Sequence, residues 1–323
     1  MWGNRLGWTI SGALVVLCGA WLYIIANASK QTPPTDFSSD ERNFAALALP
    51  APPSDAFPPA KTDIDAVGLY RQAIELYLAE RTTYDDFARR GKLDSPDVAK
   101  VKAIELFVEA APAREVKLFT STSGQIINYA REKPPLEALK VLGQICIDRL
   151  GLLNQRTGKS DEAMKYYQAG MALGWNLASE RLTYEELALG MELIAKSSAG
   201  MARLERNGLS AALRDFDRQR IDFQRERLDP VLRITRAFDA KIVGQRTGDV
   251  FELAKRAQEH MWRVEAILAL GRVRFFAGEG GTRANQASAD VLVRDLAVID
   301  PDPIIRTAAS AARDLTIEEH RMQ

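Results

Sequence analysis

Histidine and cysteine are scarce in this chain. Its 323 residues include two of each, namely His260, His320, Cys18 and Cys146. Neither histidine stands in an H-x-x-x-H or E-x-x-H arrangement, the spacings that place metal ligands on one face of a helix. Because Cys18 lies within a long apolar run, a disulfide with Cys146 is not expected. The sequence therefore predicts neither a metal site nor a disulfide framework.

Motifs for catalysis or nucleotide binding are missing as well. No G-x-S-x-G elbow occurs in the sequence. Gly158-Lys159-Ser160 matches the end of a phosphate-binding loop, but Leu153 stands where that loop needs its first glycine, and a helical pattern precedes it. We interpret Cys146 as a core residue and His260 as a residue where two helices meet. The sequence thus predicts no catalytic, cofactor-binding or metal-binding residues and a non-enzymatic function. The alternative is an enzyme whose site in the helical body has no recognised motif.

No excess of charge is present either. Lys plus Arg and Asp plus Glu both number 43. A balanced surface argues against nucleic-acid binding, which depends on neutralising phosphates. The stretch richest in arginine, 203–236, is interleaved with acidic residues. We interpret it as a solvated, salt-bridged helix rather than a surface for an acidic partner, with Arg218, Asp222 and Arg225 as one ladder.

One long apolar run stands near the start of the chain, at Trp8–Ala26, and it contains no charged residue. In helical form this run rises ~29 Å, about the thickness of the hydrocarbon core of a bilayer. We predict that residues 1–29 form an uncleaved anchor that meets the lipid through residues 8–26. The alternatives are a buried core helix and a signal peptide cleaved near Ala28. The run exceeds the ~7–15 apolar residues usual for signal peptides, which favours the anchor.

The charges around the run predict its orientation. The amino terminus and Arg5 precede it, whereas Lys30 is followed by the acidic residues Asp36, Asp40 and Glu41. Because basic residues tend to stay on the cytoplasmic side, we expect a cytoplasmic N-terminus and a translocated body. In a bacterium, the body of this single-pass protein would lie in the periplasm.

A proline-rich linker, residues 30–61, follows the run. Its prolines are at positions 33, 34, 50, 52, 53, 58 and 59. Proline fixes φ and lacks an N–H donor, so extended and semi-rigid structure is expected. At ~3.1 Å per residue the linker reaches up to ~100 Å. Two interpretations stay open, a disordered spacer and a docking peptide.

From residue 62 onward, helix signals follow one another. A capping box of Thr62 with Asp65 predicts one helix, and Ser95-Pro96-Asp97 predicts the start of a second that Pro112 ends or bends. A third element is expected over roughly 113–131. Pro134-Pro135 predicts a long helix over 136–156, which Gly158 stops.

The same kinds of signal continue towards residue 230. Ser160 begins a helix that we expect to end at Gly174. Thr183 with Glu186 forms a capping box for a helix running to about residue 207, and Ser210 begins a charged helix.

The segment 150–174 resembles one tetratricopeptide (TPR) unit. Leu150 and Gly151 match the leucine–glycine pair of that repeat, Ala163 its buried small residue and Tyr167 its aromatic residue. Gly170 and Trp175 depart from it, since alanine and proline are usual there. The resemblance implies two antiparallel helices that pack closely through small residues.

The C-terminal part resembles HEAT repeats. Segments 261–275 and 303–315 look like the second helices of two such repeats, each with an arginine, Arg263 or Arg306, before small and apolar residues. The turn 300–303, Asp-Pro-Asp-Pro, resembles the turn before such a helix. The two arginines lie 43 positions apart, within the period of HEAT arrays.

Together these patterns predict an all-α protein, with a single N-terminal transmembrane helix followed by an α-solenoid of antiparallel helix pairs. The expected domains are an anchor at 1–29, a linker at 30–61, a TPR-like domain at 62–244 and a HEAT-like domain at 245–323. Stacked pairs leave a concave surface suited to a peptide or protein. We therefore expect a membrane-anchored scaffold or adaptor of a bacterial envelope complex that binds a protein partner and no cofactor. The alternatives are a secreted binding protein and the enzyme named above. Neither the partner nor the oligomeric state follows from the sequence.

Overall fold

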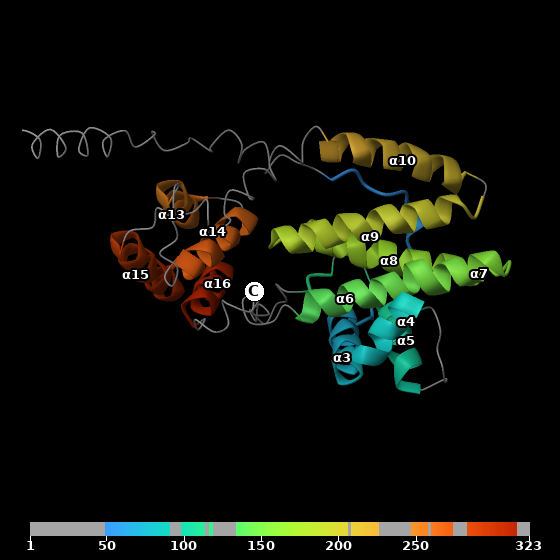
Figure 1. Ribbon diagram of the computed structural model, residues 1–323. Helices are drawn as coiled ribbons and strands as arrows, with labels where there is room; N and C mark the ends of the chain where they lie inside the picture. Colours follow the sequence, from blue (N-terminus) through green and yellow to red (C-terminus); the bar gives the residue numbers. More distant parts are fainter. Residues whose placement is uncertain are drawn as a thin grey trace, which may run out of the picture. The chain divides into compact units, whose positions relative to one another are not determined.

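The computed structural model shows a chain built from helices (Figure 1). Within the described residues every regular element is helical and no strand occurs, which confirms the all-α prediction. The predicted anchor and the first part of the linker, residues 1–48, lie outside the described residues. No helix within the described part is long and apolar enough to cross a bilayer. The structure describes residues 49–90, 98–113, 116–118, 134–205, 208–225, 247–257, 260–273 and 283–314.

The first helix, α3 (Ala66–Ala79), begins one residue after the predicted capping box. Its cap is Asp65, whose side chain accepts a hydrogen bond from the N–H of Gly68 at 2.9 Å. Thr62 instead donates its hydroxyl to Asp63 at 2.6 Å, so its predicted part in the cap is wrong. The carboxylate of Asp65 adjoins the first turn and satisfies one of its free N–H groups, that of Gly68.

Helices α4 (Arg81–Arg90) and α5 (Val98–Ala110) complete this region. The sequence pattern does not predict α4, because half of the segment is charged and its buried residues are Tyr84 and Phe87. Tyr84 packs against Tyr77 of α3 with ring centroids 5.9 Å apart. The predicted end of α5 near Pro112 is confirmed, since the helix stops at Ala110.

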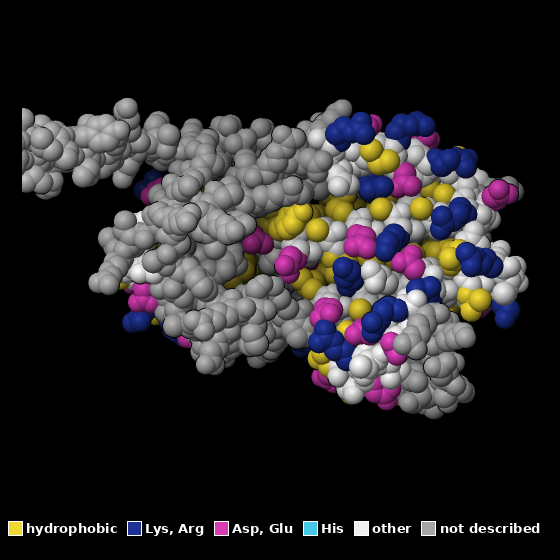
Figure 2. Space-filling view, in the orientation of Figure 1, with side chains coloured by type: hydrophobic (Ala, Val, Ile, Leu, Met, Phe, Trp, Pro, Cys, Tyr) yellow, Lys and Arg dark blue, Asp and Glu magenta, His cyan; other side chains and the backbone are white. Residues whose placement is uncertain are grey.

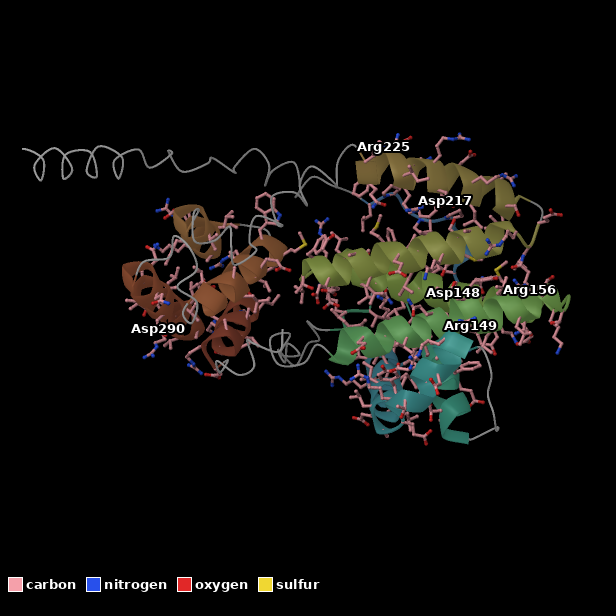
Figure 3. All side chains as sticks on the ribbon, viewed as in Figure 1. Asp148, Arg149, Arg156, Asp217, Arg225 and Asp290 are labelled. Atoms are coloured by element: carbon pink, nitrogen blue, oxygen red, sulfur yellow. The ribbon has the colours of Figure 1, made fainter. Side chains whose placement is uncertain are left out.

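The predicted long helix is present, but its register changes in the middle. It runs through α6 (Pro134–Gln144), a π-helical segment η2 (Ile145–Gly151) and α7 (Leu152–Arg156). Gly158, with φ of 75°, ends it as expected. Within η2, the neighbours Asp148 and Arg149 reach different helices (Figure 3).

Arg149 caps the end of α4. Its guanidinium donates to the carbonyl oxygens of Ala88 and Arg89, both at 2.6 Å. These carbonyls belong to the last turn of α4, where helical partners are missing and positive charge is favourable. Asp148 meanwhile pairs with Lys196 at 3.1 Å. The π segment therefore ties α6 and α7 to two neighbouring elements.

Helices α8 (Ser160–Glu180) and α9 (Tyr184–Ala202) pack at very short range. The expected end of α8 at Gly174 is wrong, because the helix continues to Glu180. A Cβ atom at Gly174 would lie 2.8 Å from the carbonyl oxygen of Gly190, and one at Gly190 would lie 2.7 Å from the backbone N of Ala178. Gly174 is thus a contact residue that lets two backbones approach, and not a helix stop.

The start of α9 follows the predicted capping box. The Thr183 hydroxyl accepts from the N–H of Glu186 at 3.2 Å, and the Glu186 carboxylate accepts from the N–H of Leu182 at 2.8 Å. Both side chains therefore satisfy backbone donors at a buried helix end.

Replacing Thr183 with alanine is expected to lower the free energy of unfolding by about 1 kcal/mol, because the N–H of Glu186 loses its acceptor. Urea denaturation followed by circular dichroism measures the change. Thr157→Ala is the control, since this exposed threonine bonds only to carbonyls of its own helix end. A loss no larger than that of the control would contradict the assigned cap.

Helix α10 (Leu209–Phe223) begins after Gly208, which has φ of 79°. Ser210, the predicted start, lies inside the helix and is buried. Leu213, Phe216 and Phe223 form the inner face, and charged residues form the outer face. Arg218 pairs with Asp215 at 3.5 Å, where the sequence predicts a ladder with Asp222 and Arg225.

The C-terminal described residues form α13 (Thr247–Arg256), α14 (His260–Val273), α15 (Arg283–Ile299) and α16 (Pro303–Asp314). Helix α14 packs against α13, α15 and α16. Trp262 is fully buried in this group. Gly271 allows close approach, since a Cβ atom there would lie 2.8 Å from the Cβ of Ala312.

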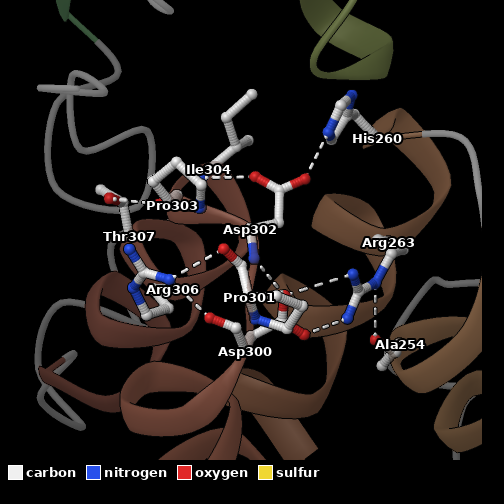
Figure 4. Close-up of polar contacts among 10 residues, drawn as sticks. All are labelled: Ala254, His260, Arg263, Asp300, Pro301, Asp302, Pro303, Ile304, Arg306 and Thr307. Carbon is white, nitrogen blue, oxygen red and sulfur yellow. Dashed lines mark hydrogen bonds and ion pairs between the residues drawn. The ribbon is translucent and has the colours of Figure 1, made fainter. Parts of the chain in front are cut away.

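The turn before α16 is held by an ionic network (Figure 4). The Asp300 carboxylate, 5% exposed, accepts hydrogen bonds from the guanidinium of Arg263. Arg306 donates to the carbonyl oxygens of Asp300 and Pro301 at 2.6 and 3.0 Å. The turn is therefore fixed both by its own helix and by α14.

His260 joins the same turn. Its Nε2 lies 2.6 Å from the Asp302 carboxylate, which also accepts the N–H of Ile304 at 2.8 Å. Burial alone would raise the pKa of Asp302, but these hydrogen bonds and the histidine outweigh it and hold that pKa below its usual value. The prediction that His260 lies where two helices meet is confirmed.

Candidate interaction cleft

An open cleft lies between α6 and α9. Its volume is about 430 Å³. Over these helices, Figure 2 shows apolar side chains in strips between charged ones. The cleft is lined by Leu136, Glu137, Lys140, Tyr184, Glu185, Ala188, Leu189 and Glu192.

The lining residues recur at helical spacing, so each wall is one face of a helix. The α9 wall uses positions 184, 185, 188, 189 and 192, and the α6 wall uses 136, 137 and 140. Leu136 and Leu189 are nearly buried and form an apolar floor, whereas Ala188 is exposed. The cleft therefore offers apolar contact below a polar rim.

Two of the three cleft carboxylates already have partners in the chain. Glu137 pairs with Arg81 at 2.6 Å, and Glu192 pairs with Lys196 at 2.9 Å. Burial alone would raise the pKa of Glu192, but the hydrogen bond and charge of Lys196, together with the charge of Lys140, keep it below its usual value. Glu192 therefore stays ionised at neutral pH.

Lys196 connects the cleft to the π segment. Its ammonium group also contacts Asp148 at 3.1 Å, so it bridges two carboxylates. Burial alone would lower the pKa of Lys196, but hydrogen bonds to Glu192 and Asp148 raise it. This bridge links α9 to η2 beside the cleft.

The remaining two charged residues lie on opposite walls of the cleft. Lys140 on α6 and Glu185 on α9 are exposed, and neither forms an ion pair within the described residues. Both side chains are open to further contacts, and the charge of Lys140 also acts on Glu192. The arrangement thus provides an apolar floor with exposed charges of opposite sign on its two walls.

The residues considered during the sequence analysis lie elsewhere. Cys146 is a free, fully buried thiol in η2, and burial raises its pKa, which makes it a poor nucleophile. Gly158 and Lys159 form the turn between α7 and α8, and Ser160 begins α8. His320 falls outside the described residues. Among the described residues, no group of three His, Cys, Asp or Glu side chains is placed to hold a metal ion.

The helical pattern of the sequence predicts a concave binding surface but does not indicate these residues. In the sequence, these residues lie on one face of each of two helical segments, 136–140 and 184–192. The two faces form a cleft only because α6 and α9 are adjacent. No family model, no curated protein and no solved structure matches this chain, so the cleft is interpreted from its own residues.

Proposed function

We propose that this protein is a membrane-tethered helical adaptor that binds a segment of a protein partner in the α6–α9 cleft. The observation that carries the proposal is the apolar floor of Leu136 and Leu189 between the exposed charges of Lys140 and Glu185. The apolar floor would provide buried contact area, and the two charges would set the orientation of the bound segment.

The chemistry of the partner follows from the cleft. One or two apolar side chains would fill the floor, an acidic residue would face Lys140 and a basic residue would face Glu185. A volume of about 430 Å³ accepts a few side chains and not a folded domain. The partner segment is therefore a short helix or an extended peptide.

The arrangement of the helices supports the solenoid part of the proposal. A Cβ atom at Gly151 would lie 2.7 Å from the Tyr167 ring, and one at Gly200 would lie 2.3 Å from it. The ring is thus packed between glycines of the helices on either side of α8. This close packing suits a TPR-like unit, and the network around Asp300 suits the HEAT-like pair.

The tether is the predicted anchor at residues 8–26. In a bacterium, the orientation predicted from the flanking charges would put the body in the periplasm. A secreted protein cleaved near Ala28 is the alternative. The intact mass of membrane-extracted protein distinguishes the two, because loss of residues 1–28 would exclude the anchor.

Reversing both free charges of the cleft tests the proposal. We expect the full-length Lys140→Glu/Glu185→Lys variant, purified in detergent from its native membranes, to retain at most about a tenth of the partner recovered with wild type. Quantitative mass spectrometry measures the recovery. Glu109→Lys, an exposed change on α5, is the control and should retain full recovery. Equal recovery with the double variant and the control would contradict the proposal.

A further inference from the structure

The second half of the proline-rich linker lies on the helices. We call residues 51–61 the strap; they appear at the blue end of the colour bar in Figure 1. The sequence leaves open a disordered spacer and a docking peptide, and the strap is docked. It contains the 3-10 turn η1 (Ser54–Ala56), in which the N–H of Ala56 donates to the carbonyl of Pro53 at 2.9 Å.

One glutamine of α8 holds the backbone of the strap. The Gln168 side-chain amide donates to the carbonyl oxygens of Asp55 and Phe57, at 3.1 and 3.0 Å. Two turns further along α8, the ring of Trp175 meets that of Phe57 edge-on, with centroids 6.5 Å apart. Because residues seven apart share one face of a helix, Gln168 and Trp175 form a single receiving surface.

The middle of the strap turns two apolar side chains towards the helices and its polar side chains towards solvent. Pro52 and Ala56 are buried, with Ala56 at 0% exposure, whereas Ser54 and Asp55 are exposed. The turn η1 also contacts α10, and the N–H of Lys61 donates to the carbonyl of Pro112 at 3.1 Å, just after α5. The strap thus crosses from α10 over α8 to the end of α5.

The contacts between α8 and the strap indicate which kind of segment this surface binds. The surface binds main-chain carbonyls, a small side chain, an aromatic ring and a proline, and it leaves the polar side chains in solvent. Extended proline-rich segments suit such surfaces because their backbone is already ordered and carries unused carbonyls. Recognition of this kind does not require the segment to belong to the same chain.

We propose that the α8 surface around Gln168 and Trp175 is a binding site for an extended proline-rich segment of a partner, and that the strap fills it in cis until the partner displaces it. A tethered segment has an effective concentration in the millimolar range, so the strap competes strongly without binding tightly. The site is separate from the α6–α9 cleft and does not depend on the function proposed for it.

A peptide-binding experiment on the full-length chain tests this site. The probe is a fluorescent peptide of residues 51–60, APPSDAFPPA, followed by anisotropy. Ala56→Arg/Phe57→Ala in the chain should release the strap, and this variant should bind the probe at least tenfold more tightly than wild type. Adding Gln168→Ala should weaken probe binding at least tenfold. A probe with the same two changes is the control and should not bind.

The proposal would be overturned if wild type and the released variant bound the probe with equal affinity, or if Gln168→Ala did not weaken binding. It would also be overturned if no form of the chain bound the probe. Far-ultraviolet circular dichroism checks that the variants fold. If the variants do not fold, hydrogen exchange measured on the wild-type chain tests the proposal instead. Excess unlabelled probe should then increase exchange of the Ala56 and Phe57 amides at least threefold, and unchanged exchange would overturn the proposal.

Discussion

Replacing Gly190 with valine is expected to lower the free energy of unfolding by about 3 kcal/mol, the upper end of the usual cost of overpacking. Any Cβ at this position would lie 2.7 Å from the backbone N of Ala178 and 2.7 Å from the carbonyl oxygen of Gly174. Both obstacles are backbone atoms of α8, so no change of rotamer relieves the contact. The two helices would have to separate, and the buried surface between them would be lost.

Gly143→Ala is the matched control for this prediction. A Cβ at Gly143 would lie 2.9 Å from Leu193, but the atom it meets is a terminal methyl group that can rotate away. Because alanine favours a helix interior by up to about 1 kcal/mol over glycine, the control should be neutral or stabilising. Urea denaturation measures both. A Gly190→Val variant as stable as the control would show that α8 and α9 do not pack this closely.

Replacing Arg263 with methionine is expected to cost about 3–5 kcal/mol, the usual cost of leaving one partner of a buried ion pair alone. The side chains of Arg263 and Asp300 are 13% and 5% exposed. Without the guanidinium, the Asp300 carboxylate keeps one hydrogen bond among the described residues, from the N–H of Asp302 at 3.0 Å. The carbonyl of Ala254 would also lose its hydrogen bond from Arg263.

The control for Arg263 is an ion pair of the same type on the surface. Arg294 pairs with Asp290 at 2.9 Å, and its side chain is 63% exposed. Exposed pairs contribute about 0–1 kcal/mol, so Arg294→Met should change thermal or urea stability little. Equal effects of the two substitutions would show that the turn at Asp300 does not depend on its ionic network.

Helix boundaries were predictable wherever one residue settles them locally. Pro134, Gly158 and the Thr183–Glu186 capping box act on backbone groups within one turn, and the structure confirms all three. The role of Gly174 could not be predicted from its local sequence. Glycine both ends helices and lets helices touch, and the choice depends on Gly190 of the neighbouring helix.

Features that depend on neighbouring elements were not predictable. The charged segment 81–90 becomes helical by burying Tyr84 and Phe87 and by having its end capped by Arg149, a residue about 60 positions away. The π segment places Asp148 and Arg149 against different elements, and nothing in the local pattern of residues 145–151 indicates it. The cleft likewise exists only because α6 and α9 are adjacent.

The central claim is that a partner binds in the α6–α9 cleft, and site-specific photocrosslinking tests it most directly. A photoreactive phenylalanine analogue would replace Ala188, which is exposed in the cleft, in the full-length chain within its native membranes. Ala211, exposed at the start of α10, is the matched control position. The account predicts a discrete crosslinked partner from position 188 that is lost in the Lys140→Glu/Glu185→Lys background. No adduct at 188, or the same adduct from 211, would contradict it.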